Sequence, residues 1–397
     1  MNTGMIPLVV AFTPNYFVPA ATCLYSIFEN MQMEVRLHII CLLSEELPER
    51  LKQKIQQIGG ERACYSFVNL KGRLQDIYVD TKYTEAASYR LLLPDLLPEY
   101  EKVMYIDCDV IVRNDLARLY YSTELGTHYL AAVFEAPADF QIEHLKAIGC
   151  APSEYINSGF LIMNLELMRR DDMVAKFIEA SKADYLEFPD QDVLNQLCKK
   201  RILGLPPYCN SIRTFYLPQY KRFFLQKYTE QDWIEVHQHG TVHYTGAKPW
   251  NHFTVEFQLW WQYYEQLPEE IKEEWQINKK IRFLSGLYGT SLGTLMIWNV
   301  QRKTSILKQH KKVADFWTPI IDAYHNETIE RYALKPKKEL DTRKVIWQYW
   351  GQGLDSDDLP EIVRICFDSV DKHKADYQVI RLTDTTLSEY LDFPDFV

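Results

Sequence analysis

Short apolar runs alternate with amphipathic stretches in the amino-terminal part of the chain, and this pattern constrains the fold more than any other feature. A buried strand is predicted at residues 7–12, further strands at 35–40 and 63–68, and helices at residues 16–28 and 48–58. Strands that alternate with helices form a parallel sheet covered on both faces. The sequence therefore predicts an α/β fold with a Rossmann-like, mostly parallel sheet.

The pattern continues to about residue 250 and then changes to helices alone. Further strands are predicted at residues 129–134 and 159–165, and further helices at 84–97, 168–183, 192–199, 253–267 and 268–280. We therefore expect an α/β domain over residues 1–265, a mainly helical extension over 266–334, and a separate carboxyl-terminal segment over 335–397.

Composition excludes several classes of protein. A formal net charge of −10 argues against nucleic-acid binding. The eight cysteines form no Cys-x-x-Cys pair, which argues against a zinc ribbon or a disulfide framework and fits a reducing cytoplasm. No signal-peptide pattern opens the chain, and no apolar run has transmembrane length. We expect a cytoplasmic protein.

A cluster of basic residues surrounds the apolar residues 283–300. Lysines and arginines at 279–282 and 302–312 could hold this region against anionic lipid, so residues 279–312 predict a peripheral membrane contact. The alternative is a buried helix with solvated lysines.

The sequence Asp107-Cys108-Asp109 follows an apolar run at residues 102–106. Side chains two residues apart on an extended segment leave the same face, so both carboxylates can converge on one divalent cation. Ligands of doubly wound sheets bind beyond the carboxyl ends of the strands, which is where this pair falls. Taken alone, the pair could equally be a solvated acidic turn.

Four further segments carry polar groups at predicted strand or helix ends. They are residues 11–16, 155–160, 189–192 and 243–250. The first can present backbone and small polar groups to a base and ribose. No glycine-rich dinucleotide fingerprint follows the first strand, which argues against a dehydrogenase.

These segments together resemble glycosyltransferase family 8, which includes the lipopolysaccharide galactosyltransferases and glycogenin. Five motifs carry the resemblance in the family's order: Ala-Phe-x-x-Asn-Tyr at 11–16, Tyr-Arg-Leu-x-x-Pro at 89–94, Asp-x-Asp at 107–109, Asn-Ser-Gly-Phe at 157–160, and His-x-x-Gly-x-Lys-Pro-Trp at 243–250. The resemblance covers about residues 5–265. It implies a GT-A type, manganese-dependent, retaining transferase of nucleotide-diphosphate sugars.

A metal site is expected at Asp107, Asp109 and His243. An imidazole beside carboxylates favours Mn²⁺, with Mg²⁺ as the second choice, and the ion would act as a Lewis acid at the phosphates. Lys248 can place an ammonium group on the departing phosphate, and Gly246 lets the backbone approach it. The alternative for His243 is a structural histidine.

The resemblance implies roles for the other motif residues. Donor contacts are expected from Ala11, Thr13, Asn15, Tyr16, Cys108, Asn157 and Ser158. The residues expected to act in catalysis are Arg90, Asp190 and Gln191, with Gln191 closest to the reacting carbon. Arg90 could instead form a structural ion pair with Asp107, and Asp190 could instead cap a helix. An amide is a poor nucleophile, so we expect front-face attack without a covalent sugar on the enzyme.

Two other regions carry weaker signals. Residues 345–351, 359–361 and 377–380 are similar to the opening of family 32 sugar transferases, the capsular-polysaccharide group, which makes residues 335–397 an add-on module or the start of a second transferase-like domain. Residues 71–83 precede the predicted donor helix and could close over a bound sugar nucleotide.

The sequence thus predicts a bacterial retaining hexosyltransferase that uses a UDP-sugar, with galactose favoured over glucose. The expected acceptor is a glycan on a cell-surface glycoprotein or glycolipid. One alternative is glycogenin-like self-glucosylation of a tyrosine, and another is a non-catalytic glycan-binding scaffold. Nucleotidylyl transfer would need a glycine- and arginine-rich loop after the first strand, and Thr13-Pro14-Asn15 does not supply it.

Overall fold

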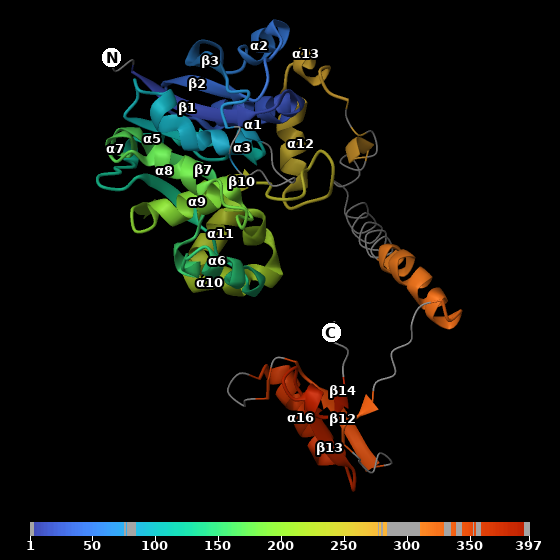
Figure 1. Ribbon diagram of the computed structural model, residues 1–397. Helices are drawn as coiled ribbons and strands as arrows, with labels where there is room; N and C mark the ends of the chain where they lie inside the picture. The colour runs from blue at the N-terminus through green and yellow to red at the C-terminus, as the bar shows by residue number, and fades with distance from the viewer. Residues whose placement is uncertain are drawn as a thin grey trace. The chain divides into compact units, whose positions relative to one another are not determined.

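Figure 1 shows the computed structural model of the protein, which divides into two compact units, Met1–Trp298 and Asn299–Val397. The structure describes residues 4–74, 77, 85–276, 278, 281–283, 310–328, 335–338, 344–351, 353–354 and 359–392. The finer division into three parts at residues 265 and 334 stays a prediction.

A seven-stranded mixed sheet forms the centre of the first unit, in the order β3-β2-β1-β4-β7-β6-β8. Its strands are β1 (Met5–Phe12), β2 (Arg36–Leu43), β3 (Ala63–Asn69), β4 (Lys102–Ile106), β6 (Leu130–Phe134), β7 (Ile156–Asn164) and β8 (Ile202–Gly204). Strands β1, β2, β3 and β4 pair in parallel, whereas β7 runs antiparallel to both β4 and β6. The predicted α/β fold class is confirmed.

Each face of the sheet packs against its own hydrophobic core. Successive side chains of a strand point to opposite faces, so Leu8 and Val10 of β1 join one core while Val9 joins the other. The first core includes residues of α1 (Phe17–Asn30) and α12 (Phe257–Gln266). The second includes residues of α7 (Leu165–Arg170), α8 (Met173–Ala180) and α9 (Pro189–Cys198). Helices on both faces of the sheet are visible in Figure 1.

Several observed elements differ from the predicted ones in where they begin or in being divided into shorter elements. The helix predicted at 84–97 is three short turns, α3 (Glu85–Ser88), η3 (Tyr89–Leu92) and α4 (Leu93–Leu96). The helix predicted at 168–183 is divided into α7 and α8, because Asp172 adopts a positive φ of 50°. Strand β7 begins at Ile156, three residues before the predicted start, so Asn157 and Ser158 lie within the sheet.

A second, three-stranded sheet in the order β5-β10-β9 stands next to the carboxyl end of β4. It consists of β5 (Val110–Ile111), β9 (Ser211–Ile212) and β10 (Val242–His243). His243 pairs with Val110, and the Tyr244 amide donates to the Asp109 carbonyl oxygen at 3.0 Å. This small sheet therefore brings His243 beside Asp107-Cys108-Asp109.

Among its described residues, the second unit contains two pairs of strands and two α-helical segments, the first of which covers residues 310–325. Strands β12 (Val345–Tyr349) and β13 (Gln378–Leu382) pair in parallel, and β11 (Lys335–Pro336) pairs with β14 (Leu391–Asp392). Helix α16 spans Glu361–His373. The Arg381 guanidinium of β13 donates to the Phe367 carbonyl oxygen of α16 at 3.2 Å, which ties the helix to the strands.

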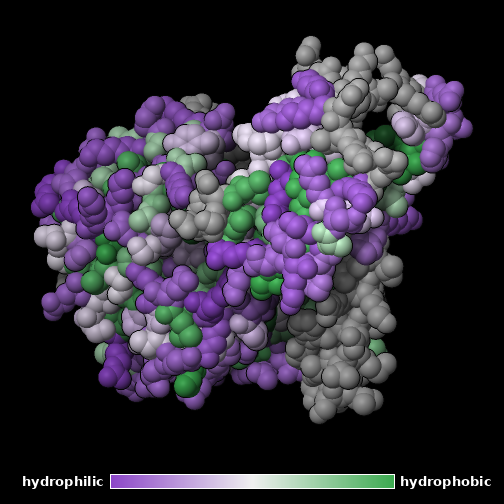
Figure 2. Space-filling model, turned by 90° about the horizontal axis from the view of Figure 1, so that it is seen from below, coloured by the Kyte–Doolittle hydropathy of each residue, from purple (hydrophilic) through white to green (hydrophobic). Residues whose placement is uncertain are grey.

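Hydrophilic side chains predominate on the face drawn in Figure 2. Within the described ranges, no helix combines the length and the apolar character needed to cross a bilayer. Most of residues 279–312, which carry the predicted membrane contact, lies outside the described residues, as does most of the possible closing segment at 71–83.

Candidate active site at the carboxyl edge of the sheet

Three side chains with oxygen or nitrogen ligand atoms meet where β4 ends. Ligand atoms of Asp107, Asp109 and His243 all lie within 4.8 Å of one another. His243 Nε2 lies 3.7 Å from Asp107 Oδ2 and 3.4 Å from Asp109 Oδ1. Two carboxylates and an imidazole at this spacing have the geometry and chemistry of a divalent metal site.

A hydrogen bond from Nδ1 to Asn210 determines the orientation and the tautomer of the His243 ring. Asn210 donates through Nδ2 to Asn157 Oδ1 at 2.9 Å, so Asn210 Oδ1 is an acceptor and receives the His243 Nδ1 hydrogen at 3.1 Å. The lone pair of a neutral imidazole is then left on Nε2, the atom that faces the carboxylates. The sequence reading missed Asn210, because a single asparagine outside any motif gives no signal.

Gly159 of β7 makes room for the His243 ring. A Cβ atom at this position would lie 2.1 Å from His243 Cε1 and 2.9 Å from Asp107 Oδ2. The Gly159 carbonyl oxygen also accepts the Asp107 amide hydrogen at 2.9 Å. Glycine is therefore required here for close approach of the ring and not for an unusual backbone angle.

Lys248 forms an ion pair with Asp109 and donates to the Tyr244 carbonyl oxygen at 2.8 Å. Burial favours the neutral form of Asp109, but the positive charge of the Lys248 ammonium group and the hydrogen bond it donates outweigh this and hold the pKa of Asp109 well below its ordinary value. Asp109 is therefore ionised at neutral pH, as a metal ligand must be.

Arg90 connects two acidic residues of the site. Its Nη2 atom donates to Asp107 Oδ1 at 2.7 Å, its Nε atom lies 3.2 Å from Asp190 Oδ2, and Nη1 donates to the Ser158 carbonyl oxygen. The Arg90 side chain is 3% exposed, and the side chains of its partners Asp190 and Asp107 are 10% and 23% exposed, so the guanidinium is buried while Asp107 keeps some contact with water. Burial raises the pKa of Asp190, and the Arg90 charge opposes that rise.

Asp190 and Gln191 lie in the first turn of α9. The N-cap of this helix is Phe188, so the alternative role of Asp190 as its N-cap is not what the structure shows. Ser158 Oγ donates to Asp190 Oδ2 at 3.0 Å. Both Asp190 and Gln191 are buried at 7% exposure, and both face Ser158 of β7.

The Gln191 amide is bonded on both sides. Its Oε1 accepts from the Ser158 amide at 3.0 Å and from Asn157 Nδ2 at 3.1 Å. Its Nε2 donates to Tyr155 Oη at 2.9 Å and to Glu135 Oε1 at 3.3 Å. Burial raises the pKa of Glu135. The sequence reading missed Glu135, although its position directly after a predicted strand was a usable signal.

The predicted donor segment lies beside the acidic pair. Ala11 is the residue before the last one of β1, at the carboxyl end of that strand. The Cys108 thiol lies 3.6 Å from the Ala11 carbonyl oxygen. Thr13 precedes a 3-10 turn, Pro14–Tyr16, in which its hydroxyl bonds to Asn15. Burial and the charge of Asp109 raise the pKa of Tyr16.

Gly246 lies between His243 and Lys248 with a φ of 83°, in the left-handed region that favours glycine. The nearest side-chain atom to a Cβ built there is Arg213 Nη1, at 3.8 Å. The loop between β10 and Lys248 is therefore held in a tight turn beside a guanidinium group.

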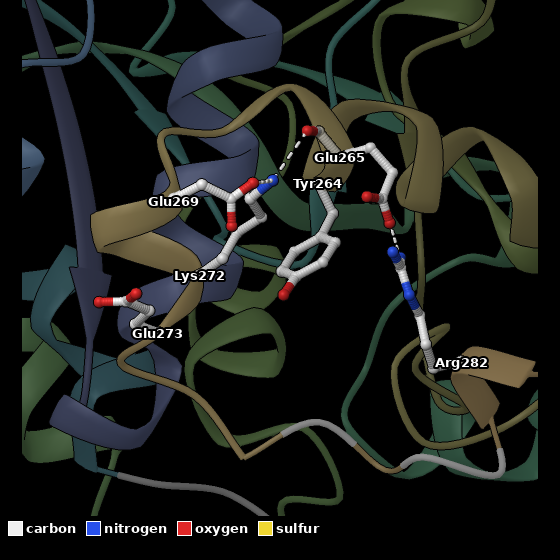
Figure 3. A pocket seen from close by; sticks show the side chains of 6 residues that line it. All are labelled: Tyr264, Glu265, Glu269, Lys272, Glu273 and Arg282. Carbon is white, nitrogen blue, oxygen red and sulfur yellow. Dashed lines mark hydrogen bonds and ion pairs between the residues drawn. The ribbon is translucent and has the colours of Figure 1, made fainter.

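A cavity of about 280 Å³ lies elsewhere, lined by Tyr264, Glu265, Glu269, Lys272, Glu273 and Arg282 (Figure 3). None of its lining residues belongs to the site described above. Most of its charge is compensated, because Lys272 pairs with Glu269 at 2.6 Å and Arg282 pairs with Glu265, which leaves the single carboxylate of Glu273 in excess. It does not compete with the acidic cluster as the functional site.

Two family models match the chain. Residues 7–254 match the model described as glycosyl transferase family 8, and residues 297–397 match the one described as capsular polysaccharide synthesis protein. Both resemblances expected from the sequence are confirmed, and the second extends further toward the amino terminus than the motifs that indicated it.

Curated relatives share the first of these regions. General stress protein A of Bacillus subtilis is 28% identical over 238 residues, which are 57% of this chain and 80% of that protein. A lipopolysaccharide 1,2-glucosyltransferase of Escherichia coli is 28% identical over 194 residues, which are 46% of this chain and 54% of that protein. The chain thus spans about half the length of the Escherichia coli relative.

Among solved structures, the galactosyltransferase LgtC in complex with donor and acceptor sugar analogues superposes with a TM-score of 0.57 and 24% identity. The match covers 68% of this chain and 100% of that one, and it supports the GT-A type of sheet. Since the family model spans more than half of the chain and all five motifs fall inside it or at its edge, the protein belongs to glycosyl transferase family 8.

Proposed function

We propose that the protein is a retaining, metal-dependent hexosyltransferase that moves a sugar from a UDP-sugar to a glycan acceptor. The observation that carries this proposal is the convergence of Asp107, Asp109 and His243 at the carboxyl edge of the sheet. In an open α/β sheet, this edge is where nucleotide ligands bind.

The three residues fit a divalent cation. Asp109 is held ionised by the Lys248 ammonium group, and His243 presents Nε2 because Nδ1 is bonded to Asn210. Mixed carboxylate and imidazole ligands favour Mn²⁺, and Mg²⁺ is the second choice. When bound, the ion would supply Lewis-acid stabilisation of the diphosphate.

Lys248 is the cation best placed for the leaving group. It pairs with Asp109 at the same site, so a phosphate that enters beside the metal ligands comes within reach of its ammonium group. Gly246 keeps the preceding turn free of a side chain, which allows close backbone approach. Ala11, Thr13, Asn15 and Tyr16 would hold the nucleoside at the adjacent end of β1.

Arg90, Asp190 and Gln191 would act on the sugar. Arg90 holds Asp107 and Asp190 on either side of one guanidinium, and Asp190 can accept hydrogen bonds from sugar hydroxyls. Gln191 presents an uncharged amide oxygen, a poor nucleophile but a suitable partner for positive charge at the reacting carbon. We therefore favour front-face attack, in which the leaving phosphate takes the acceptor's proton.

Galactose is the first choice of donor sugar and glucose the second. The names of the relatives include both a glucosyltransferase and a galactosyltransferase, which supports a hexose without separating the two. We place catalysis in residues 1–265, and we propose that the acceptor is a glycan on a cell-surface glycoprotein or glycolipid.

The test is a panel of nucleotide sugars incubated with Mn²⁺, with released nucleotide and protein mass measured with and without chelator. We expect a UDP-hexose to release UDP only when the metal is present. Turnover that persists in chelator would refute the metal assignment. A stepwise gain of protein mass without added acceptor would identify self-glucosylation instead, and no release from any donor would favour a binding scaffold.

A further inference from the structure

Asp192, the neighbour of Gln191 on α9, is fully buried and surrounded by hydrogen-bond donors. Its Oδ1 accepts from Tyr155 Oη at 2.6 Å. Its Oδ2 accepts from the backbone amides of Glu187 and Phe188 at 3.0 Å each and lies 3.0 Å from His144 Nε2. Since a carboxylate only accepts, each of these groups must direct a hydrogen toward Asp192.

The direction of the Tyr155 hydroxyl is therefore determined. Its hydrogen points to Asp192, and an oxygen lone pair remains to accept the Gln191 Nε2 hydrogen at 2.9 Å. Burial raises the pKa of Tyr155 well above its ordinary value, so the hydroxyl keeps its hydrogen at neutral pH. Tyr155 can thus accept from Gln191 but cannot also donate to it.

The remaining hydrogen bonds of Gln191 favour the same orientation of its amide group. Glu135 Oε1 accepts the second hydrogen of Nε2 at 3.3 Å, while the Ser158 amide donates to Oε1 at 3.0 Å. A rotation of the amide by 180° would place Nε2 against the Ser158 donor and Oε1 against the Glu135 carboxylate. Such contacts leave buried polar groups unpaired, which is unfavourable.

We infer that Tyr155 and Asp192 form a positioning pair that fixes which way the Gln191 carbonyl oxygen points. The inference rests on the proposed function, in which that oxygen faces the reacting carbon of the donor sugar. Neither Tyr155 nor Asp192 needs to touch substrate for this role. His144, at 3.0 Å from Asp192, holds the far end of the same chain of hydrogen bonds.

A double-mutant cycle tests the inference, using Gln191→Ala, Tyr155→Phe and the combined variant. If Tyr155 acts through Gln191, the Phe substitution lowers kcat about tenfold in the wild-type background, which is the rate equivalent of one buried hydrogen bond. It leaves the donor KM within about twofold, because binding of the nucleotide does not depend on the direction of this amide. In the Gln191→Ala background, the same substitution changes kcat less than about twofold.

Asp192→Asn is a second variant that tests the same positioning role. The side-chain oxygen of Asn would face the donors at Glu187 and Phe188, and its amide group would donate to Tyr155. The hydroxyl would then turn its hydrogen toward Gln191 and favour the rotated amide. We expect the same loss of kcat with an unchanged donor KM, although the side chain keeps its shape.

Tyr129→Phe is the matched control. Tyr129 is also buried and donates to a carboxylate, Asp171 Oδ2, at 2.7 Å, but it contacts no residue of the site. We expect this variant to keep the kcat of the wild type. The melting temperatures of all variants show whether a lower kcat is accompanied by a less stable fold.

The possible failures are distinguishable. If Gln191→Ala slows transfer but Tyr155→Phe lowers kcat by the same factor in both backgrounds, the positioning role is refuted and the proposed function stands. If Gln191→Ala leaves kcat unchanged, the role proposed for Gln191 is itself wrong, and the positioning role fails with it. A rise in donor KM without a change in kcat for Tyr155→Phe and Asp192→Asn would also refute the inference.

Discussion

Arg90 and Asp107 come from a short helical turn and from the end of a strand, yet Arg90 Nη2 lies 2.7 Å from Asp107 Oδ1. The same guanidinium lies 3.2 Å from Asp190, and it is almost completely buried. One cation thus holds two of the acidic groups of the candidate site in fixed positions.

Replacement of Arg90 by Met should therefore be strongly destabilising. The buried carboxylate of Asp190 and the partly buried one of Asp107 would lose their counter-charge, and breaking a buried pair in this way costs about 3–5 kcal/mol of unfolding free energy. Urea unfolding followed by tryptophan fluorescence measures the loss. Arg201→Met is the control, because Arg201 forms a half-exposed pair with Asp171 at 2.9 Å, and such pairs contribute about 0–1 kcal/mol. Equal losses for the two variants would contradict the buried role.

Asp109→Asn should remove metal-dependent turnover and leave the fold intact. Loss of residues that only orient metal ligands lowers affinity or activity about 10- to 100-fold, so loss of a ligand should cost at least about 100-fold. Calorimetric titration with Mn²⁺ in the presence of UDP measures the affinity, and circular dichroism checks the fold. Asp171→Asn, far from the cluster in the sequence and outside it in the structure, should bind Mn²⁺ as the wild type does. Near-normal turnover by Asp109→Asn would overturn the metal site.

Glu135→Gln should change how stability depends on pH. Burial raises the pKa of Glu135 above the ordinary value of 4.5, so the folded state binds this proton more tightly than the unfolded state. Its contribution is thus favourable below pH 4.5 and is lost as the pH rises through the folded-state pKa, by at most about 1.4 kcal/mol per pH unit. Gln lacks this titration.

The unfolding free energies of wild type and Glu135→Gln, measured from pH 4 to pH 8, should therefore diverge as the pH rises, with the variant gaining relative to the wild type. Other titrating groups are common to both proteins and cancel in the difference. A difference that stays constant with pH would show that Glu135 titrates normally.

Gly159→Ala should disturb the site through packing alone. The added Cβ would lie 2.1 Å from His243 Cε1, so the ring must move away from Asp107 and Asp109. Overpacking of this kind costs about 1–3 kcal/mol of stability. We expect weaker Mn²⁺ binding and slower turnover in a protein that still folds, measured by calorimetry and by released UDP. Unchanged metal affinity would mean that the ring position is not critical.

Much of the fold could be predicted from local patterns. The apolar runs that became β1 and β2 are mostly buried, β3 is half-buried, and the helices between the strands repeat apolar residues at helical spacing. The site was located because Asp107 and Asp109 follow β4 directly, and topology places the end of such a strand at the ligand-binding edge.

The sequence could not reveal Asn210, Glu135 or the pairing of Tyr155 with Asp192. Each acts through partners far away in the chain, such as the 37 residues between Tyr155 and Asp192. The start of β7 was also missed, because Asn157 and Ser158 are polar, and polar residues are rarely predicted in strands. Their polar groups are buried because Glu135 after β6 and Asp190 and Gln191 of α9 supply hydrogen-bond partners.

Strand β7 runs opposite to both of its neighbours, β4 and β6. Its first residues therefore share an edge with the residues that follow those strands: Asn157 donates to Glu135, and the Gly159 carbonyl oxygen accepts from the Asp107 amide. A wholly parallel sheet offers its ligands only the loops that leave its strands. Because one strand is reversed, residues that pair with strands on both sides line the floor of the candidate site.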